Sequence, residues 1–279
     1  MKKLTEILAL LLCFVIAVGC FVSCDENKQT PDDANNSVNT DKDNKNPDED
    51  KKQEDEPLPL DKYTIKSSIR FATNDYKMKD AVASMNSSVI IDVDKENVCV
   101  NLVSVNEDIS VNKTYVLYDG VLYHSIEAVV GEYSVVEYEK AAMGNEDKDS
   151  LLKNVGAGAS IGFGDFKTHN MTVSGGHTIY TCTDITEDSR LSLSRLFASN
   201  FEGSETTVEV KKATYILEAK GEYNYNSTLS CNFVIDMEGS VYEITMHVTN
   251  EYTYSNDISV SLPQNSDEYV EKLYGDIIG

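Results

Sequence analysis

The stretch Tyr115-Val116-Leu117-Tyr118-Asp119-Gly120-Val121-Leu122-Tyr123 decides the fold class of this 279-residue chain. Two runs of strand-forming residues flank the dipeptide Asp119-Gly120. Asp-Gly suits the two central positions of a type I′ turn, which both need a positive φ and which match the twist of an antiparallel pair. The stretch therefore predicts a β-hairpin.

Further turn signals stand between strand-like runs elsewhere in the chain. Glu238-Gly239 repeats the pattern, and Asp94–Asn97 indicates a looser turn. Residues 91–107 align without gaps on residues 235–251, which we interpret as two hairpins built on one plan. Consecutive hairpins of this kind predict an antiparallel meander.

Helix signals are few. Residues 149–155 suffice for one short turn of helix, and the stretch from Ser189 to Phe201 carries the better signal. Asp188 or Ser189 is available there as the N-cap. Three large apolar residues share one helical face and are expected to pack on the sheet or to cover a cavity in it. They are Leu193, Leu196 and Phe197.

The chain from Leu58 to Gly279 is predicted to form a single domain, mostly β (α+β) in class. Period-two alternation along Tyr63–Phe71 gives a strand with one apolar face, and Pro263 is the only proline well inside the domain. We expect a strongly curved antiparallel sheet or half-barrel with one or two short helices on its concave side. A curved sheet with an apolar inner face is suited to enclose a ligand.

Residues 1–23 are predicted to be a secretory signal, because Lys2 and Lys3 precede a continuous apolar run. The end of this run resembles the lipobox of bacterial lipoproteins, with Phe21-Val22-Ser23 preceding Cys24. Cys20 also fits the pattern and stays an alternative. The resemblance implies a lipidated cysteine that anchors the protein to the outer face of the bacterial cytoplasmic membrane, at the cell surface or in the periplasm.

Residues 24–57 are predicted to be a disordered acidic tether. They hold 12 acidic residues, 5 Lys and Val38 as their one large apolar residue beyond Cys24. Such a segment buries too little apolar surface to offset its ordering entropy. The whole chain carries a formal net charge of −23, which excludes a nucleic-acid partner because phosphate contacts need a basic face.

One sequence motif points to catalysis. Gly158-Ala159-Ser160-Ile161-Gly162 matches the G-x-S-x-G nucleophile pattern, and Asp184 and His247 follow in the order of a hydrolase triad. That elbow works only between a strand and a helix, and the sequence around it predicts no such unit. We therefore expect no enzyme and interpret the segment as a Gly-rich loop or a mobile flap. The apolar tip of that flap would be Ile161, Phe163 and Phe166.

No metal and no cofactor is expected. Asp92, Asp94 and Glu96 alternate near a turn, but their spacing departs from a Ca²⁺ loop. The four His lack zinc-type spacing, and no phosphate-binding Gly-rich motif is present. If Cys24 is lipidated, three cysteines remain, so either three thiols or one disulfide with one thiol is open. They are Cys99, Cys182 and Cys231.

The domain resembles exported proteins of the LolA/LppX-like type, which fold as an antiparallel half-barrel around a lipid cavity. The resemblance lies in residues 206–269, with Leu262-Pro263 near their end, and in the hairpin around Asp119-Gly120. These proteins usually begin with a helix, whereas Leu58–Lys62 leads straight into a strand. The resemblance implies lipid binding and offers no catalytic residues.

We therefore expect a membrane-anchored lipoprotein that binds a lipid or another amphipathic molecule in an apolar concave pocket. The expected pocket residues come from the Gly-rich loop and from the better-predicted helix: Ile161, Phe163, Phe166, Leu193, Leu196 and Phe197. The alternative is a surface module for a protein or glycan partner, with its concave side plugged by its own helix. The Tyr-rich strands at Tyr223–Tyr225 and Tyr252–Tyr254 favour this alternative.

Overall fold

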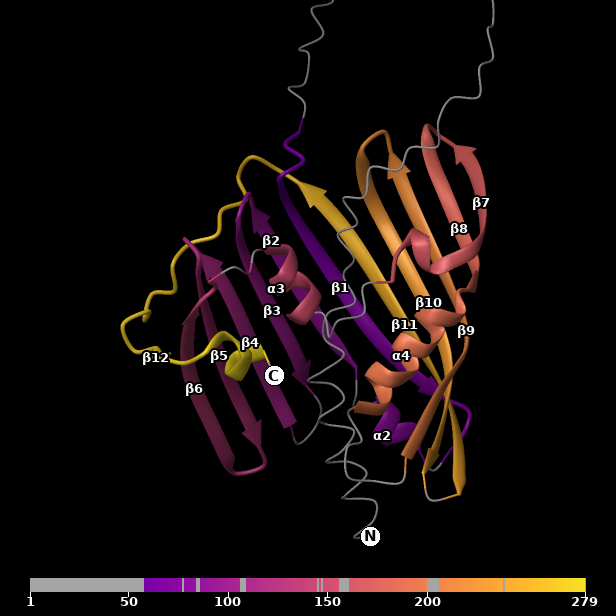
Figure 1. Ribbon diagram of the computed structural model, residues 1–279, viewed down its shortest axis with the longest axis horizontal. Coiled ribbons are helices and arrows are strands. Elements are labelled where there is room, and N and C mark those ends of the chain that lie inside the picture. The colour runs from indigo at the N-terminus through magenta and orange to yellow at the C-terminus, as the bar shows by residue number, and fades with distance from the viewer. Residues whose placement is uncertain are drawn as a thin grey trace, which may run out of the picture.

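The computed structural model describes residues 58–278 apart from 77, 84–85, 106–108, 145, 147, 156–160, 200–205 and 238. Its strands form one 12-stranded sheet in the order β12-β6-β5-β4-β3-β2-β1-β11-β10-β9-β8-β7 (Figure 1). The strands are β1 (Lys62–Thr73), β2 (Ser87–Asp94), β3 (Asn97–Val105), β4 (Ile109–Tyr118), β5 (Val121–Val130), β6 (Tyr133–Ala142), β7 (Phe166–Ser174), β8 (His177–Ile185), β9 (Thr206–Lys220), β10 (Tyr223–Met237), β11 (Ser240–Tyr254) and β12 (Val270–Glu271).

The predicted turns join neighbouring antiparallel strands. Asp119 and Gly120 have φ values of 49° and 76°, as a type I′ turn between β4 and β5 requires. Lys95 has φ 59° in the turn between β2 and β3. Gly239 has φ 82° between β10 and β11, while Glu238 lies outside the described residues. The expected meander is therefore confirmed at these turns.

Strand β1 lies in the middle of the sheet and joins its two halves. It pairs with β2 on one side and with β11 on the other, so the two hairpins with similar sequences flank it. Alternate residues of β1 point into the core, as the sequence predicts. These are Tyr63, Ile65, Ser67, Ile69 and Phe71.

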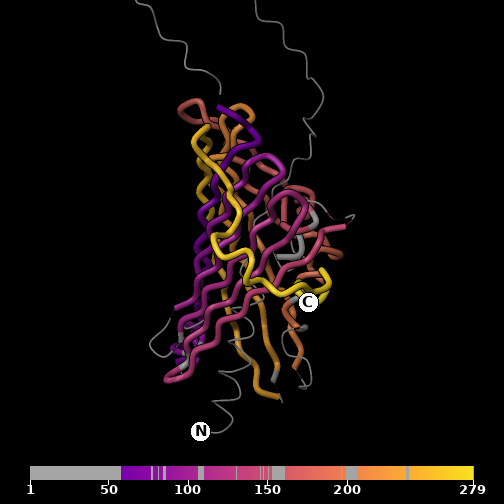
Figure 2. Tube along the Cα trace, turned by 90° about the vertical axis from the view of Figure 1, so that its left-hand side faces the viewer, coloured from indigo at the N-terminus to yellow at the C-terminus, as the bar shows by residue number. Residues whose placement is uncertain are grey.

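The sheet is curved, and its helices cover the concave face (Figures 1 and 2). The fold class is therefore as predicted. The two expected helices are α3 (Lys148–Val155) and α4 (Glu187–Ser199). Two helices of five residues each, α2 (Lys79–Ala83) and α5 (Tyr274–Ile278), were not predicted, because a single helical turn carries too little periodicity.

The N-cap of α4 differs from the prediction. Helix α4 begins at Glu187, and the Oγ1 of Thr186 accepts a hydrogen bond from the Ser189 amide (3.3 Å). Thr186 is therefore the N-cap, and neither Asp188 nor Ser189 fills that role. The chain leaves β8 one residue before Thr186, so the connection is too short to place the cap later.

A segment at the C-terminus, which we call the C-terminal clamp (residues 269–278), wraps around the β6 edge. Tyr269 packs against Tyr123 and Tyr138, with ring centroids at 5.4 and 5.2 Å. Strand β12 then pairs with β6 in parallel. Helix α5 reaches the concave face, where Ile277 joins the core. The clamp thus touches both faces of the sheet and covers its β6 edge.

Residues 1–57 lie outside the described residues, and with them the predicted signal, Cys24, its alternative Cys20 and the tether. Within the described part of the chain, no helix has the length and apolar composition to span a membrane.

Candidate functional site

Four of the six residues predicted to bind a ligand are buried in the core: Ile161, Phe166, Leu193 and Phe197. Phe197 of α4 is fully buried and stacks on Phe233 of β10, with ring centroids 4.8 Å apart. Leu193 is buried on the same helix, whereas the side chain of Leu196 is outside the described part. Helix α4 therefore plugs this part of the concave face.

The loop residues of the same prediction lie beside α4. Phe166 and Ile161 are buried, and the ring of Phe166 stacks at 6.3 Å on Tyr215 of β9. Phe163 is half-buried and stacks at 4.2 Å on His169. In this structure these side chains contact the protein's own core, and the structure brings the loop and the helix together as one layer over β7–β10.

Asp165 ties this loop to α4. Its Oδ2 accepts a hydrogen bond from the Gly162 amide (2.8 Å), and its Oδ1 accepts one from the Ser189 hydroxyl. Its carbonyl oxygen accepts a third from the Thr186 amide (2.7 Å). These bonds hold the described part of the loop, residues 161–165, against the helix. Residues 156–160, which contain the other glycines of the predicted flap, lie outside the described residues.

The G-x-S-x-G motif does not stand between a strand and a helix. Ser160 lies outside the described residues, the element before it is α3, and those after it are a short 3₁₀ helix (Phe163–Asp165) and β7. Asp184 on β8 accepts a hydrogen bond from Thr168 (2.9 Å), and His247 lies on β11, further along the sheet beyond β9 and β10. The elements needed for a nucleophile elbow are therefore not arranged around this segment.

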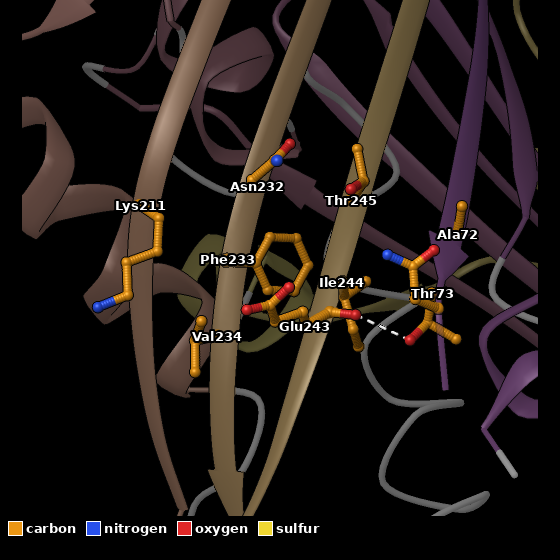
Figure 3. A pocket seen from close by; sticks show the side chains of 10 residues that line it. Ala72, Thr73, Lys211, Asn232, Phe233, Val234, Glu243, Ile244 and Thr245 are labelled. Atoms are coloured by element: carbon orange, nitrogen blue, oxygen red, sulfur yellow. Dashed lines mark hydrogen bonds between the residues drawn. The ribbon is translucent and has the colours of Figure 1, made fainter. Parts of the chain in front are cut away.

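A small depression lies on the outer face of the sheet, between β9, β10, β11 and β1 (Figure 3). Its volume is about 210 Å³, and Figure 3 shows Lys211, Asn232 and Thr245 side by side on neighbouring strands. The Thr73 hydroxyl donates to the Glu243 carbonyl (2.8 Å) at one end. Ligand pockets usually measure about 300–1,000 Å³, so this one is small for a lipid.

A larger pocket of about 610 Å³ lies at the end of the sheet where β1 begins. We call it the turn pocket, because three chain connections meet around it: the β2–β3 turn, the β4–β5 turn and the segment between β6 and α3. Its lining residues are Lys62, Asp94, Lys95, Glu96, Asn97, Leu117, Asp119, Gly120, Met143, Glu146 and Lys148.

Hydrogen bonds between the three connections fix the shape of the turn pocket. The Asp119 amide donates to Oδ1 of Asn97 (3.2 Å), which links the two hairpin turns. The Met143 amide donates to the Gly120 carbonyl (3.0 Å), which links the second turn to the α3 connection. Gly120, with φ 76°, is a position where a side chain would strain the backbone.

The rim of the turn pocket carries both charge signs and its floor is apolar. Lys62 Nζ lies 3.0 Å from Asp94 Oδ1 and donates to the Ile258 carbonyl at 3.0 Å, so this pair is fixed. Lys95 and Glu96 are exposed at the rim. Leu117 and Met143 form the floor and are each 4% exposed, as parts of the core. The arrangement suits a molecule with an apolar part and a polar or zwitterionic head.

Sequence reasoning found two of these turns but not the pocket between them. The signal was present in Asp94–Asn97 and Asp119-Gly120, since successive hairpins of a meander bring alternate turns to the same end of a sheet. The third connection, around Met143, carried no such signal.

Two of the acidic side chains near the β2–β3 turn, Asp92 and Asp94, pair with side chains of β1. Asp92 accepts a hydrogen bond from the Thr64 hydroxyl, and Asp94 pairs with Lys62.

Cys99, Cys182 and Cys231 are free thiols, which settles the open question of their pairing. Burial raises the pKa of Cys182 to about 11 and that of Cys231 to about 12, so both are poor nucleophiles. Among the described residues no group of three or more His, Cys, Asp or Glu side chains could hold a metal.

Comparisons with known proteins add little. No protein-family model and no curated protein matches the chain. The dehydratase domain from the CurJ module of curacin polyketide synthase is 8% identical, with 68% of this chain and 75% of that chain covered and a TM-score of 0.12. An inactive mutant of the CurJ dehydratase in complex with a compound is 7% identical, with the same coverage and TM-score. TM-scores this low support no inference on fold or function.

Proposed function

We propose that this protein is a membrane-anchored extracytoplasmic lipoprotein that binds a lipid or another amphipathic molecule. The turn pocket is the observation that carries the proposal. It has the volume of a ligand site, an apolar floor at Leu117 and Met143, and a rim of mixed charge. The proposal moves the binding site from the concave residues around α4, which pack against the core, to the end of the sheet.

The position of the turn pocket supports a ligand taken from a membrane. Lys62 at its rim begins β1, and the chain enters the domain at Leu58, four residues earlier. The predicted tether therefore joins the domain at the end that carries the pocket. Leu58 and Leu60 are 48% and 42% exposed beside this entry point, which adds apolar surface there.

Native mass spectrometry of residues 58–279, purified without detergent, tests the proposal. This segment contains the whole described core, so it is expected to fold alone. We expect a bound mass of lipid size that solvent extraction releases. A bare protein mass, with no uptake of added phospholipid or fatty acid, would contradict lipid binding.

Two charge variants locate the site. Lys148→Glu changes the rim of the turn pocket, and Lys211→Glu makes the same change at the outer depression. We expect Lys148→Glu to weaken binding of a fluorescent phospholipid about fivefold, roughly 1 kcal/mol, and Lys211→Glu to leave it unchanged. The reverse pattern would assign the ligand to the outer depression.

A second candidate function is a surface module for a protein partner. The observation that favours it is the packing of Leu193 and Phe197 against the sheet, which fills this part of the concave face. A bare mass in native mass spectrometry, together with retention of the domain by a surface partner, would support this function.

A further inference from the structure

The two edges of the sheet differ in how they are protected. At one edge the C-terminal clamp covers β6, through β12 and the Lys272 amide, which donates to the Lys140 carbonyl (2.9 Å). At the other edge β7 pairs only with β8 among the described strands. Residues 169–174 of β7 are all exposed, with Met171 at 63% and Val173 at 68%.

From Thr168 onward, strand β7 also lacks the features that usually keep an edge strand from pairing. Such strands carry Lys, Pro or a bulge that blocks further pairing. Here the irregularity and the one Lys fall together at the start of the strand, where Lys167 has no paired residue between Phe166 and Thr168 and Asp184 of β8 has φ 59°. From Thr168 to Ser174 the strand has no Pro, Gly, Lys or carboxylate.

The absence of carboxylates on this edge determines whether another acidic chain can approach it. The chain carries a net charge of −23, so two copies repel each other across most surfaces. Residues 168–174 hold no acidic side chain, and a second copy can approach there without like charges facing each other at close range.

We propose that the edge of β7 is a homodimer interface, in which two copies pair antiparallel around a two-fold axis at Met171. An axis perpendicular to the sheet requires that paired residue numbers sum to an even value, because only then do both apolar faces stay on the same side. Centring on Met171 pairs Met171 with itself and Val173 with His169. On the opposite face it pairs Asn170 with Thr172. The result is a sheet that runs continuously through both copies.

The oligomeric state of the chain from Asp25 onward tests this interface. This chain keeps every described residue and lacks the lipid-type cysteines. We expect a concentration-dependent dimer in analytical ultracentrifugation and at least a tenfold weaker dimer for Met171→Lys, since the two lysines would face each other. Val241→Lys, at a 61% exposed position on the inner strand β11, is the control and should dimerise as the native chain does.

Cysteine cross-linking tests the register and does not depend on affinity. Opposed residues of an antiparallel pair have Cα atoms about 4.5–5.5 Å apart, within disulfide reach. Met171→Cys should therefore form a disulfide-linked dimer under mild oxidation. Val173→Cys should not, because the two copies of residue 173 would lie about 14 Å apart. The native chain, which has free thiols at Cys99, Cys182 and Cys231, is the control for cross-links that do not involve the introduced cysteine.

Several results would overturn the proposal. They are a monomer at every concentration up to about 200 µM, a dimer that Met171→Lys leaves intact, and cross-linking at position 173 but not at 171. Melting temperatures close to that of the native chain verify that both lysine variants fold. A chain that stays monomeric and pairs β7 with a segment of another protein would count against the second copy.

Discussion

His124 lies on the inner face of β5, in a row of residues that is otherwise apolar. Its neighbour across the strand pair is Tyr115, and their rings stack with centroids 4.6 Å apart. The side chain is buried, with Nδ1 at 3.4 Å from Glu139 Oε2, and within the described residues Nε2 has no hydrogen-bond partner. Burial lowers the pKa of His124 and nearby Lys113 lowers it further, against the opposing effect of Glu139.

The lowered pKa of His124 predicts a loss of stability in acid. The unfolded chain takes up this proton near pH 6.5, whereas the folded protein takes it up only at lower pH. The free energy of unfolding should therefore fall as the pH drops below about 6.5. His124→Phe, which keeps a ring on Tyr115, should flatten this dependence between about pH 7.5 and 5 in denaturant titrations.

A control at an exposed histidine separates this effect from general acid sensitivity. His247 lies exposed on β11, so His247→Phe should keep the pH dependence of the native chain. A His124→Phe chain whose stability falls with pH as steeply as the native chain would contradict the assignment to His124.

At the scale of secondary structure, the sequence correctly predicted the features that depend on a few consecutive residues. The Asp119-Gly120 turn and the alternation along β1 are properties of a few consecutive residues, and both appear as expected. The predicted N-cap of α4, Asp188 or Ser189, was wrong. The cap is Thr186, because the end of β8 determines where the helix begins. The turn pocket could not be predicted, because its three connections meet only through the whole sheet.

The cap of α4 gives a prediction at this scale. Thr186→Ala removes the oxygen that accepts from the Ser189 amide and should lower the free energy of unfolding by about 1 kcal/mol. Chemical denaturation measures the change. Ser192→Ala, at an exposed position within the same helix, is the matched control and should be neutral or slightly stabilising. Equal effects of both changes would count against Thr186 as the cap.

At the scale of the whole molecule, the C-terminal clamp determines which edge of the sheet is open. Sequence patterns do not reveal this role, since β12 has two residues and α5 has five. Burial raises the pKa of the Tyr269 hydroxyl, in keeping with its packing against the sheet. The clamp forms because Tyr269 and Ile277 find apolar contacts on opposite faces of the same edge.

Removal of the clamp should expose the β6 edge. A chain that ends after Tyr269 loses β12 and α5, and with them the contact of Ile277 with the core. We expect a lower melting temperature and self-association beyond a dimer, measured by light scattering, since both edges are then open. Leu273→Ala, at a 74% exposed position in the clamp, should change neither property. A truncated chain with unchanged melting would show that the clamp adds little.

The position of β1 has a consequence for the order in which the molecule is made. Among the described strands, β1 is the first to leave the ribosome, and it is the one that both halves of the sheet pair with. Its partner β11 follows much later, as the hydrogen bond between Ser67 and Asn250, 183 residues apart, makes plain. Pairings between such distant segments form slowly. One side of β1 therefore stays unpaired until β11 has been made, and a chaperone that shields an exposed strand edge would have to protect β1 for longer than its neighbour β2.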